Sequence, residues 1–251
     1  MKLYVVIPVF NEQDQIAEVI DQLKQVLEKE KIRYQIITVD DGSTDSTYAI
    51  LSQYQRQLPI KIIQHDMNRG VSEAFRNGFN AYITEASPDD PLLTMEANRN
   101  ADPNLIPKMI AELANGSELI LASCYAPGGK VIGDPFLRLL LSKGINYLLR
   151  LIFPLNGIHT YTSFYRLWNY QLIRSIHSMT DGKFFKQEGF VCMADMLLKI
   201  RHLESVRVKE IPFILYSDTK RTGSKMKVGK TIWGYLKLFT SNIFNKQRRV
   251  S

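Results

Sequence analysis

The sequence predicts an α/β protein with a mostly parallel central sheet flanked by helices. Three observations support this prediction. Short apolar runs alternate with amphipathic segments through the first half of the 251 residues, which is typical of repeated strand–helix units. The apolar runs are nearly continuous, as expected for strands buried on both faces. Polar residues also follow several of these runs directly, at the edge of the sheet where α/β proteins bind ligands.

The first half supplies the strands and helices of this sheet in alternation. We expect strands at residues 3–9, 34–40, 60–65, 91–95 and 118–123. The intervening helices are expected at residues 12–30, 41–54 (after an initial turn), 70–86 and 104–114. The first helix shows why: its apolar residues fall on one helical face, as in a helix that covers a sheet. They are Ile16, Val19, Ile20, Leu23 and Leu27.

The pattern changes after residue 125, where residues 136–153 form a strongly amphipathic helix. Its apolar positions have helical spacing and are Leu137, Leu140, Leu141, Gly144, Ile145, Leu148, Leu149 and Ile152. A polar stripe recurs every fourth residue, at Arg138, Ser142, Asn146 and Arg150. A core-facing helix predicts this pattern and is the simpler interpretation. However, the helix has three basic residues and no acid, so an amphipathic helix in a membrane interface is the alternative.

The remaining elements complete the chain. Residues 160–168 and 206–215 are expected to be strands, and residues 189–200 a helix between them. A last amphipathic helix with aromatic residues and lysines is expected at residues 231–244, and it too has the character of an interface helix.

Composition and charge limit the class of protein. The chain is 45% hydrophobic and 23% charged, as globular proteins are. Its two cysteines, Cys124 and Cys192, are far apart and form neither a disulfide framework nor a zinc motif. No run approaches the ~20 apolar residues of a spanning helix, and the N-terminus turns polar too soon for a signal peptide. We therefore expect a cytoplasmic protein, peripheral at the cytoplasmic face of the membrane.

The net charge of +7 is concentrated near the C-terminus. Residues 219–251 contain nine Lys or Arg and no acid, which leaves 23 basic and 25 acidic side chains elsewhere, a net charge of −2. Such a tail suits an anionic membrane surface, a diphosphate or a nucleic acid, or is simply solvated. We expect no nucleic-acid partner, because the tail lacks a known binding module and its aromatics follow helical spacing.

Two polar segments follow strands and carry candidate chemistry. In "VDDGSTD", Asp40 and Asp41 either accept hydrogen bonds from a base or ribose or form a turn. In "TMEANRNADP", Glu96, Asn98 and Asn100 are two residues apart, so an extended loop directs them to the same side. Carboxylate and amide oxygens suit Mg²⁺.

These segments occur in a recognisable order. "VVIPVFNE", "VDDGSTDST", "NRGVSEAFRNGF", "TMEANRNADP", "ASCYAPGG", "RLLLSKGINYLLR", "YTSFYR" and "GSKMKV" resemble the family-two inverting glycosyltransferases, which have the GT-A fold. The resemblance is greatest to the dolichyl- or polyprenyl-phosphate mannose (or glucose) synthase branch, and it extends from residue 3 to about residue 230.

The resemblance implies a role for each matching position. Pro8, Phe10, Glu12, Asp40, Asp41, Gly70 and Glu96 would bind the nucleotide sugar, and Glu96, Asn98 and Asn100 would bind Mg²⁺ or Mn²⁺. Arg138, Ser142 and Lys225 would bind the acceptor phosphate. The catalytic set would be Glu96, Asn98, Arg138, Lys220 and Arg221. Residues 1–218 would form the transferase domain, with a donor half to residue 125 and an acceptor half from 126, followed by a basic loop and amphipathic tail over 219–251.

The chain departs from the family pattern at two positions. The family usually has Asp-Ala-Asp where Glu96-Ala97-Asn98 stands, so we expect the ligand count to be kept and metal affinity to be weaker. The family often has Asp at the position of Thr160. A phosphate monoester is already an anionic nucleophile and needs no base, so this loss is easier to tolerate with a lipid-phosphate acceptor. Asp195 matches an acidic family position and is interpreted as a structural acid.

The expected function is hexose transfer from a GDP- or UDP-sugar to a polyprenyl or dolichyl phosphate at the membrane surface. One alternative is transfer to a saccharide or other hydroxyl acceptor in cell-surface polysaccharide synthesis. Another is a non-catalytic nucleotide-sugar-binding or membrane partner protein with a degenerate metal motif. The oligomeric state is left open.

Overall fold

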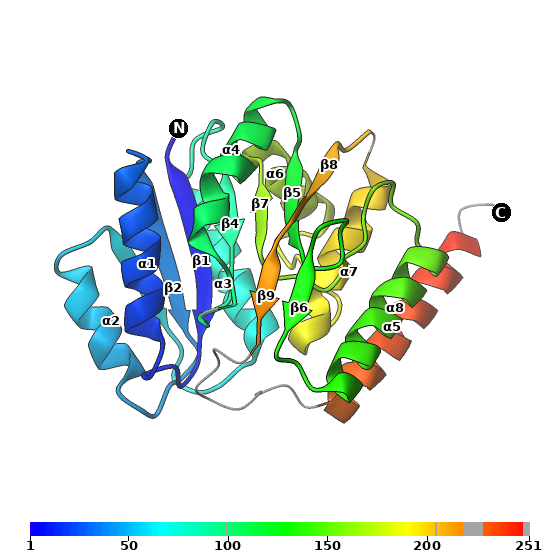
Figure 1. The fold of residues 1–251 in the computed structure, drawn as a ribbon, viewed down its shortest axis with the longest axis horizontal. Helices are drawn as coiled ribbons and strands as arrows, with labels where there is room; N and C mark the ends of the chain where they lie inside the picture. Colours follow the sequence, from blue (N-terminus) through cyan, green and yellow to red (C-terminus); the bar gives the residue numbers. More distant parts are fainter. Residues whose placement is uncertain (99, 204, 218–227, 248–251) are drawn as a thin grey trace.

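The computed structural model describes residues 1–98, 100–203, 205–217 and 228–247 (Figure 1). Its central sheet has seven strands in the order β3-β2-β1-β4-β7-β5-β8. Only β7 is antiparallel to its neighbours, β4 and β5, so the mostly parallel sheet is confirmed. The strands are β1 (Leu3–Val9), β2 (Tyr34–Asp40), β3 (Ile60–Gln64), β4 (Leu92–Thr94), β5 (Leu119–Ser123), β7 (Arg166–Trp168) and β8 (Val208–Pro212).

Helices cover both faces of this sheet. They are α1 (Ile16–Lys29), α2 (Thr47–Gln55), α3 (Val71–Glu85), α4 (Ile106–Ala114), α5 (Phe136–Ile152), α6 (Tyr170–Met179), α7 (Cys192–Lys199) and α8 (Val228–Gln247). Three single-turn 3₁₀ helices, Pro103–Leu105, Gly189–Val191 and Ile200–His202, adjoin α4 and α7. A two-stranded ribbon pairs β6 (Lys130–Ile132) with β9 (Ile214–Tyr216) in parallel.

The core has one layer on each face of the sheet, because successive strand residues point to opposite faces. In β1, Leu3, Val5 and Ile7 join one cluster with α1 and α4. Tyr4 and Val6 join the other cluster, with α3, α6 and α7. The predicted apolar face of α1 is fully buried at Ile16, Ile20, Leu23 and Leu27, and Val19 is 2% exposed.

Three sequence predictions need correction. Helix α6 was not predicted, although Asn169 caps it by accepting a hydrogen bond from the Leu172 amide at 2.7 Å. The strand expected at 160–168 consists only of its last three residues, Arg166–Trp168. The strand expected at 206–215 divides into β8, in the main sheet, and β9, in the ribbon. At Thr160 and Tyr161, side chains distant in the sequence accept the backbone hydrogen bonds, as described below.

Helix α5 is oriented with its apolar stripe outward. Asn146 and Leu149 are its buried residues, whereas Leu137, Leu140, Leu141, Leu148 and Ile152 are 39–66% exposed. The core-facing interpretation is therefore wrong for most of the stripe. The middle of the polar stripe turns inward instead, because Ser142 and Asn146 bind loops of the protein, whereas Arg150 is exposed.

Helices α5 and α8 lie side by side at one end of the molecule (Figure 1), where the Phe153 and Phe239 rings stack with centroids 5.9 Å apart. Tyr235 and Leu238 anchor α8 in the core. The outer surface of this helix pair, named here the α5/α8 apolar face, is made of exposed large side chains. They are Phe136, Leu137, Leu140, Leu141, Tyr147, Leu148, Leu151, Ile152, Ile232, Trp233 and Leu236. Contiguous exposed apolar surface of this kind marks an interaction site.

Candidate active site

The sheet brings the predicted donor residues to one edge, the lower edge in Figure 1, where its parallel strands end. Pro8 lies in β1 opposite Val39 of β2. The two loops that follow these strands are tied together, because the Asn11 amide donates to Ser43 Oγ at 2.9 Å and the Glu12 amide to Thr47 Oγ1 at 2.8 Å. Phe10 and Glu12 are half-buried at this junction.

Asp40 has a buried carboxylate oxygen with no hydrogen-bond partner among the described residues. The side chain is fully buried. Its Oδ1 accepts a hydrogen bond from the Ser43 amide at 3.0 Å, whereas Oδ2 has no partner among the described residues. An unsatisfied buried carboxylate oxygen costs free energy. Asp40 therefore suits a donor such as a base N–H or a ribose hydroxyl.

Asp41 is fully engaged within the protein. Its Oδ1 accepts from His65 Nδ1 at 2.7 Å and from the Arg69 amide at 2.8 Å, and its Oδ2 accepts from the Gly70 amide at 2.8 Å. His65 Nε2 lies 2.8 Å from the Asn77 side-chain amide, which donates to it, so the proton of this imidazole lies on Nδ1. Asp41 thus holds the loop before α3.

Gly70 begins α3 with a φ of +93°, a conformation that favours glycine. Its position at a helix N-terminus suits an anionic group of a ligand. The same loop is packed tightly on Gly42, since a Cβ there would lie 2.5 Å from the Met67 backbone. Asp41 and Gly42 together set where the N-terminus of α3 meets the donor edge.

The predicted metal residues lie in the loop after β4. Glu96 and Asn100 are half-buried and Asn98 is buried. Asn98 Oδ1 accepts a hydrogen bond from the Asn100 amide at 3.0 Å, which places these two residues together. Asn100 Oδ1 is buried and has no partner among the described residues. Within the described ranges no group of three or more His, Cys, Asp or Glu could hold a metal. The convergence of Glu96, Asn98 and Asn100 on one ion stays a prediction.

The predicted acceptor residues of α5 face the protein. Arg138 Nη1 lies 3.4 Å from Asp134 Oδ1, and its side chain is 38% exposed. Ser142 Oγ accepts a hydrogen bond from the Tyr125 hydroxyl at 2.8 Å, and burial raises the pKa of this Tyr to about 12. Lys220, Arg221 and Lys225 lie outside the described residues.

Asn146 and Glu210 shape the loop between α5 and β7, and sequence reasoning assigned neither a role there. Asn146 Oδ1 accepts from the Tyr161 amide at 2.6 Å. Glu210, 3% exposed, accepts from the His159 and Thr160 amides at 2.8 and 2.7 Å. One signal was available in the sequence. Glu210 lies on the same face of the predicted strand as Val206 and Val208, and a carboxylate is unexpected on an apolar face.

Thr160 lies where relatives often carry Asp, and its surroundings fit the absence of a base. Its Oγ1 is 2.6 Å from Ser123 Oγ, and the residue is 3% exposed. The nearby carboxylate of Glu210 is occupied by backbone amides and by His159 Nδ1, 2.9 Å away. This part of the site therefore positions a loop.

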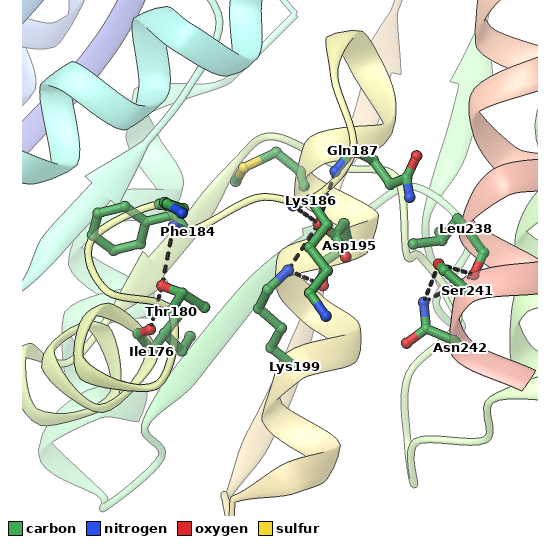
Figure 2. Close-up of polar contacts among 12 residues, drawn as sticks. Ile176, Thr180, Phe184, Lys186, Gln187, Asp195, Lys199, Leu238, Ser241 and Asn242 are labelled. Carbon is green, nitrogen blue, oxygen red and sulfur yellow. Dashed lines mark hydrogen bonds and ion pairs between the residues drawn. The ribbon is translucent and has the colours of Figure 1, made fainter. Parts of the chain in front are cut away.

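Asp195 has the structural role expected of it (Figure 2). Its Oδ2 accepts from the Lys186 and Gln187 amides at 2.5 and 3.2 Å and pairs with Lys199 Nζ at 2.8 Å. Burial lowers the pKa of Lys199, and Asp195 opposes that shift. The loop so held reaches the donor edge, where the Gly189 amide donates to Ser72 Oγ at 3.2 Å, at the start of α3.

Comparison with known proteins identifies the family. The family described as Glycosyl transferase family 2 matches residues 4–176. A dolichol-phosphate mannosyltransferase of Pyrococcus furiosus is 32% identical over 238 residues, which cover 94% of this chain and 62% of that protein. A polyprenol monophosphomannose synthase of Mycolicibacterium smegmatis is 28% identical, over 88% of this chain and 80% of that one. The chain thus spans less than two thirds of the first relative.

Solved structures share the fold at low identity. Mannosyl-3-phosphoglycerate synthase from Rubrobacter xylanophilus matches with a TM-score of 0.69 at 15% identity. The match covers 99% of this chain and 75% of the synthase chain. Glucosyl-3-phosphoglycerate synthase from Mycobacterium tuberculosis, in complex with Mn²⁺ and UDP-glucose, has a TM-score of 0.65 at 18% identity, over 91% of this chain and 74% of its own. These likenesses agree with the GT-A fold, and the family match over residues 4–176 establishes the enzyme class: the chain belongs to the family 2 glycosyltransferases.

Proposed function

We propose that the protein transfers a hexose from a nucleotide-diphosphate sugar to a polyprenyl phosphate at the cytoplasmic face of a membrane. Mannose is the first sugar to test, because the relatives from Pyrococcus furiosus and Mycolicibacterium smegmatis are named as a mannosyltransferase and a phosphomannose synthase. The donor is a GDP- or UDP-sugar.

The orientation of α5 carries this proposal. One helix turns Arg138, Ser142 and Asn146 toward the protein and Leu137, Leu141 and Leu148 outward. An amphiphilic acceptor with an anionic head and an apolar chain matches both faces of such a helix. A soluble saccharide would use the inner face alone.

The chemistry follows from the acceptor's charge. A phosphate oxygen of the acceptor attacks the anomeric carbon as the bond from that carbon to the nucleoside diphosphate breaks, so the configuration inverts and the diphosphate leaves with the electron pair. The anionic nucleophile needs no protein base, which agrees with Thr160 and with the occupied carboxylate of Glu210. Asp40 holds the nucleoside and the Gly70 end of α3 faces its phosphates.

A divalent cation fits the loop after β4. The carboxylate of Glu96 and the amide oxygens of Asn98 and Asn100 would hold Mg²⁺ or Mn²⁺, and the buried, unpartnered Oδ1 of Asn100 supports this assignment. The ion would neutralise charge on the departing diphosphate. One carboxylate makes the site weakly binding and more dependent on the donor's own phosphates.

A donor and acceptor panel tests the proposal. Labelled GDP-mannose, UDP-glucose and UDP-GlcNAc are each incubated with undecaprenyl or dolichyl phosphate and Mg²⁺ or Mn²⁺, with undecaprenol as the matched acceptor lacking phosphate. Labelled lipid from the phosphate alone is expected. Product from undecaprenol or a saccharide would favour a hydroxyl acceptor, and nucleotide binding without turnover would favour a non-catalytic protein.

Membrane contact through the α5/α8 apolar face is part of the proposal. No helix in the described part of the chain is long and apolar enough to cross a bilayer.

Leu141 and Leu148 are 48% and 45% exposed on α5, and their joint replacement by Glu should abolish sedimentation with anionic liposomes. Tyr48→Glu, at a 41% exposed site on α2 at the other end of the sheet (Figure 1), is the control and should leave sedimentation unchanged. Equal sedimentation of all three proteins would refute this surface. Deleting α8 is a poorer test, because Tyr235 and Leu238 belong to the core.

A further inference from the structure

Asp134 stands directly before the N-cap of α5 and is held in place from two sides. Its Oδ1 accepts a hydrogen bond from Ser217 Oγ and lies 3.4 Å from Arg138 Nη1. The Asp134 side chain is only 9% exposed, whereas that of Arg138 is 38% exposed. Ser217 is itself fixed to the ribbon, because its amide donates to the Ile132 carbonyl at 2.8 Å. The carboxylate is thus a fixed anion and the guanidinium the accessible partner.

We propose that Asp134 limits acceptor affinity: it is an internal anion that competes with the acceptor phosphate for the guanidinium of Arg138. This inference rests on the proposed function, which gives Arg138 the acceptor phosphate. It concerns how tightly a phosphorylated acceptor binds there.

The contact has the character of an exchangeable pair. A charge-assisted hydrogen bond between guanidinium and carboxylate spans about 2.7–2.9 Å, so the 3.4 Å separation is loose. A phosphate monoester offers three acceptor oxygens and up to two negative charges, and guanidinium groups bind such oxyanions in two-point contacts. A phosphate can therefore draw the guanidinium of Arg138 away from its loose pairing with Asp134, which a neutral alcohol cannot do.

Ser142 extends the same site by one helical turn. Its Oγ accepts from the Tyr125 hydroxyl, which leaves the Ser142 hydroxyl proton free to donate to a phosphate oxygen. Once the phosphate is bound, Asp134 stays close to it as a like charge, because Ser217 holds the carboxylate. Asp134 thus lowers affinity for every acceptor, and a phosphate has the charge to overcome it.

Removing the carboxylate should tighten phosphate binding. A solvent-accessible ion pair contributes about 0.2–1 kcal/mol, so Asp134→Asn should lower the dissociation constant of citronellyl phosphate, a short prenyl phosphate, by about 1.4- to fivefold. Calorimetry measures this constant without turnover. Asp134→Ser provides a second neutral variant in case the first folds poorly. Citronellol, which lacks the phosphate, should bind more weakly than citronellyl phosphate to the wild type.

Two further variants separate this role from a structural one. Ser217→Ala releases the carboxylate but keeps its charge, so it should tighten binding less than Asp134→Asn does. Arg138→Gln should weaken binding of citronellyl phosphate. Asp134→Asn introduced into the Arg138→Gln variant should tighten binding by a smaller factor than it does in the wild type. In turnover, Asp134→Asn should lower KM for the acceptor and leave kcat unchanged.

Each outcome is decisive. Unchanged or weaker binding by folded Asp134→Asn and Asp134→Ser overturns the inference, as does equal tightening by Ser217→Ala or undiminished tightening by Asp134→Asn in the Arg138→Gln background. Those results leave the proposed function standing. If neither the wild type nor any variant binds citronellyl phosphate while all bind the nucleotide, the acceptor assignment fails and the inference fails with it.

Discussion

Matched Asn substitutions at Asp40 and Asp41 should separate nucleotide binding from folding stability. At position 40, Asn keeps the acceptor for the Ser43 amide and replaces the unpartnered Oδ2 with an NH₂ group. The free protein loses no hydrogen bond. The ligand loses an acceptor for a base or ribose donor and meets a donor instead.

The size of each effect follows from the contacts. A hydrogen bond to a charged group is worth about 1.5–3 kcal/mol, so Asp40→Asn should weaken nucleotide binding about 10- to 150-fold. Its Tm should be unchanged or higher, because a buried carboxylate with an unpartnered oxygen is replaced by a neutral amide, whose burial costs less. Asp41→Asn turns one of three accepted hydrogen bonds into a contact between two donors. That should cost about 1–3 kcal/mol, a fall in Tm of about 2–12 °C for a protein of this size.

Titration with GDP and UDP in the presence of Mn²⁺ measures the first effect, and thermal unfolding measures the second. Wild-type affinity in Asp40→Asn would show that its free oxygen faces no ligand. A normal Tm in Asp41→Asn together with lost nucleotide affinity would show that Asp41 contacts the nucleotide directly. Either result would refute the division of roles between these neighbours.

Three further predictions concern other parts of the chain. Asn98→Asp restores a second carboxylate beside Glu96 and should lower the Mn²⁺ concentration for half-maximal turnover by about tenfold; an unchanged metal titration would argue against the site. On α5, Leu149→Ala in the core should cost about 2–5 kcal/mol of unfolding free energy. Leu148→Ala, at an exposed position, should cost about 0.5 kcal/mol or less. Equal losses measured by denaturant unfolding would contradict the orientation of the helix. Asp195→Ala leaves Lys199 buried without its partner and should cost about 3–5 kcal/mol, and an additional Lys199→Met should recover part of this loss.

Local patterns in the sequence predicted most of the parallel sheet and its helices. The alternation of apolar runs and amphipathic segments is set by burial, and burial shows directly in the sequence as periodicity. The face of α1 is an example, since all five apolar residues predicted to pack are buried. The domain limits at residues 125 and 218 stay predictions.

The elements that were mispredicted depend on partners far away in the chain. Residues 159–162 resemble a strand in composition, but Glu210 and Asn146 bind their amides from 50 and 15 residues away. The orientation of α5 was equally hidden, because an apolar stripe has the same period whether it faces a core or a membrane. The orientation becomes clear only from the fold, in which Asn146 is buried and binds the loop before β7.

The same limit applied within the candidate site. Asp40 and Asp41 are adjacent acids in the same turn motif, and residue type alone does not show which of them binds a ligand. The His65 and Gly70 contacts that occupy Asp41 come from the following strand and helix. No sequence pattern indicated a role for Asp134, because its proposed role depends on the fold placing Arg138 and Ser217 next to it.

The central claim is that the acceptor is recognised by its phosphate at Arg138. Initial rates of transfer from the best labelled donor to undecaprenyl phosphate and to undecaprenol, by wild type and Arg138→Gln, test it most directly. The account predicts product from the phosphate only, with a rate at least tenfold lower in Arg138→Gln, as expected for loss of a charge-assisted contact worth about 1.5–3 kcal/mol. Comparable product from undecaprenol, or an undiminished rate with Arg138→Gln, would contradict it.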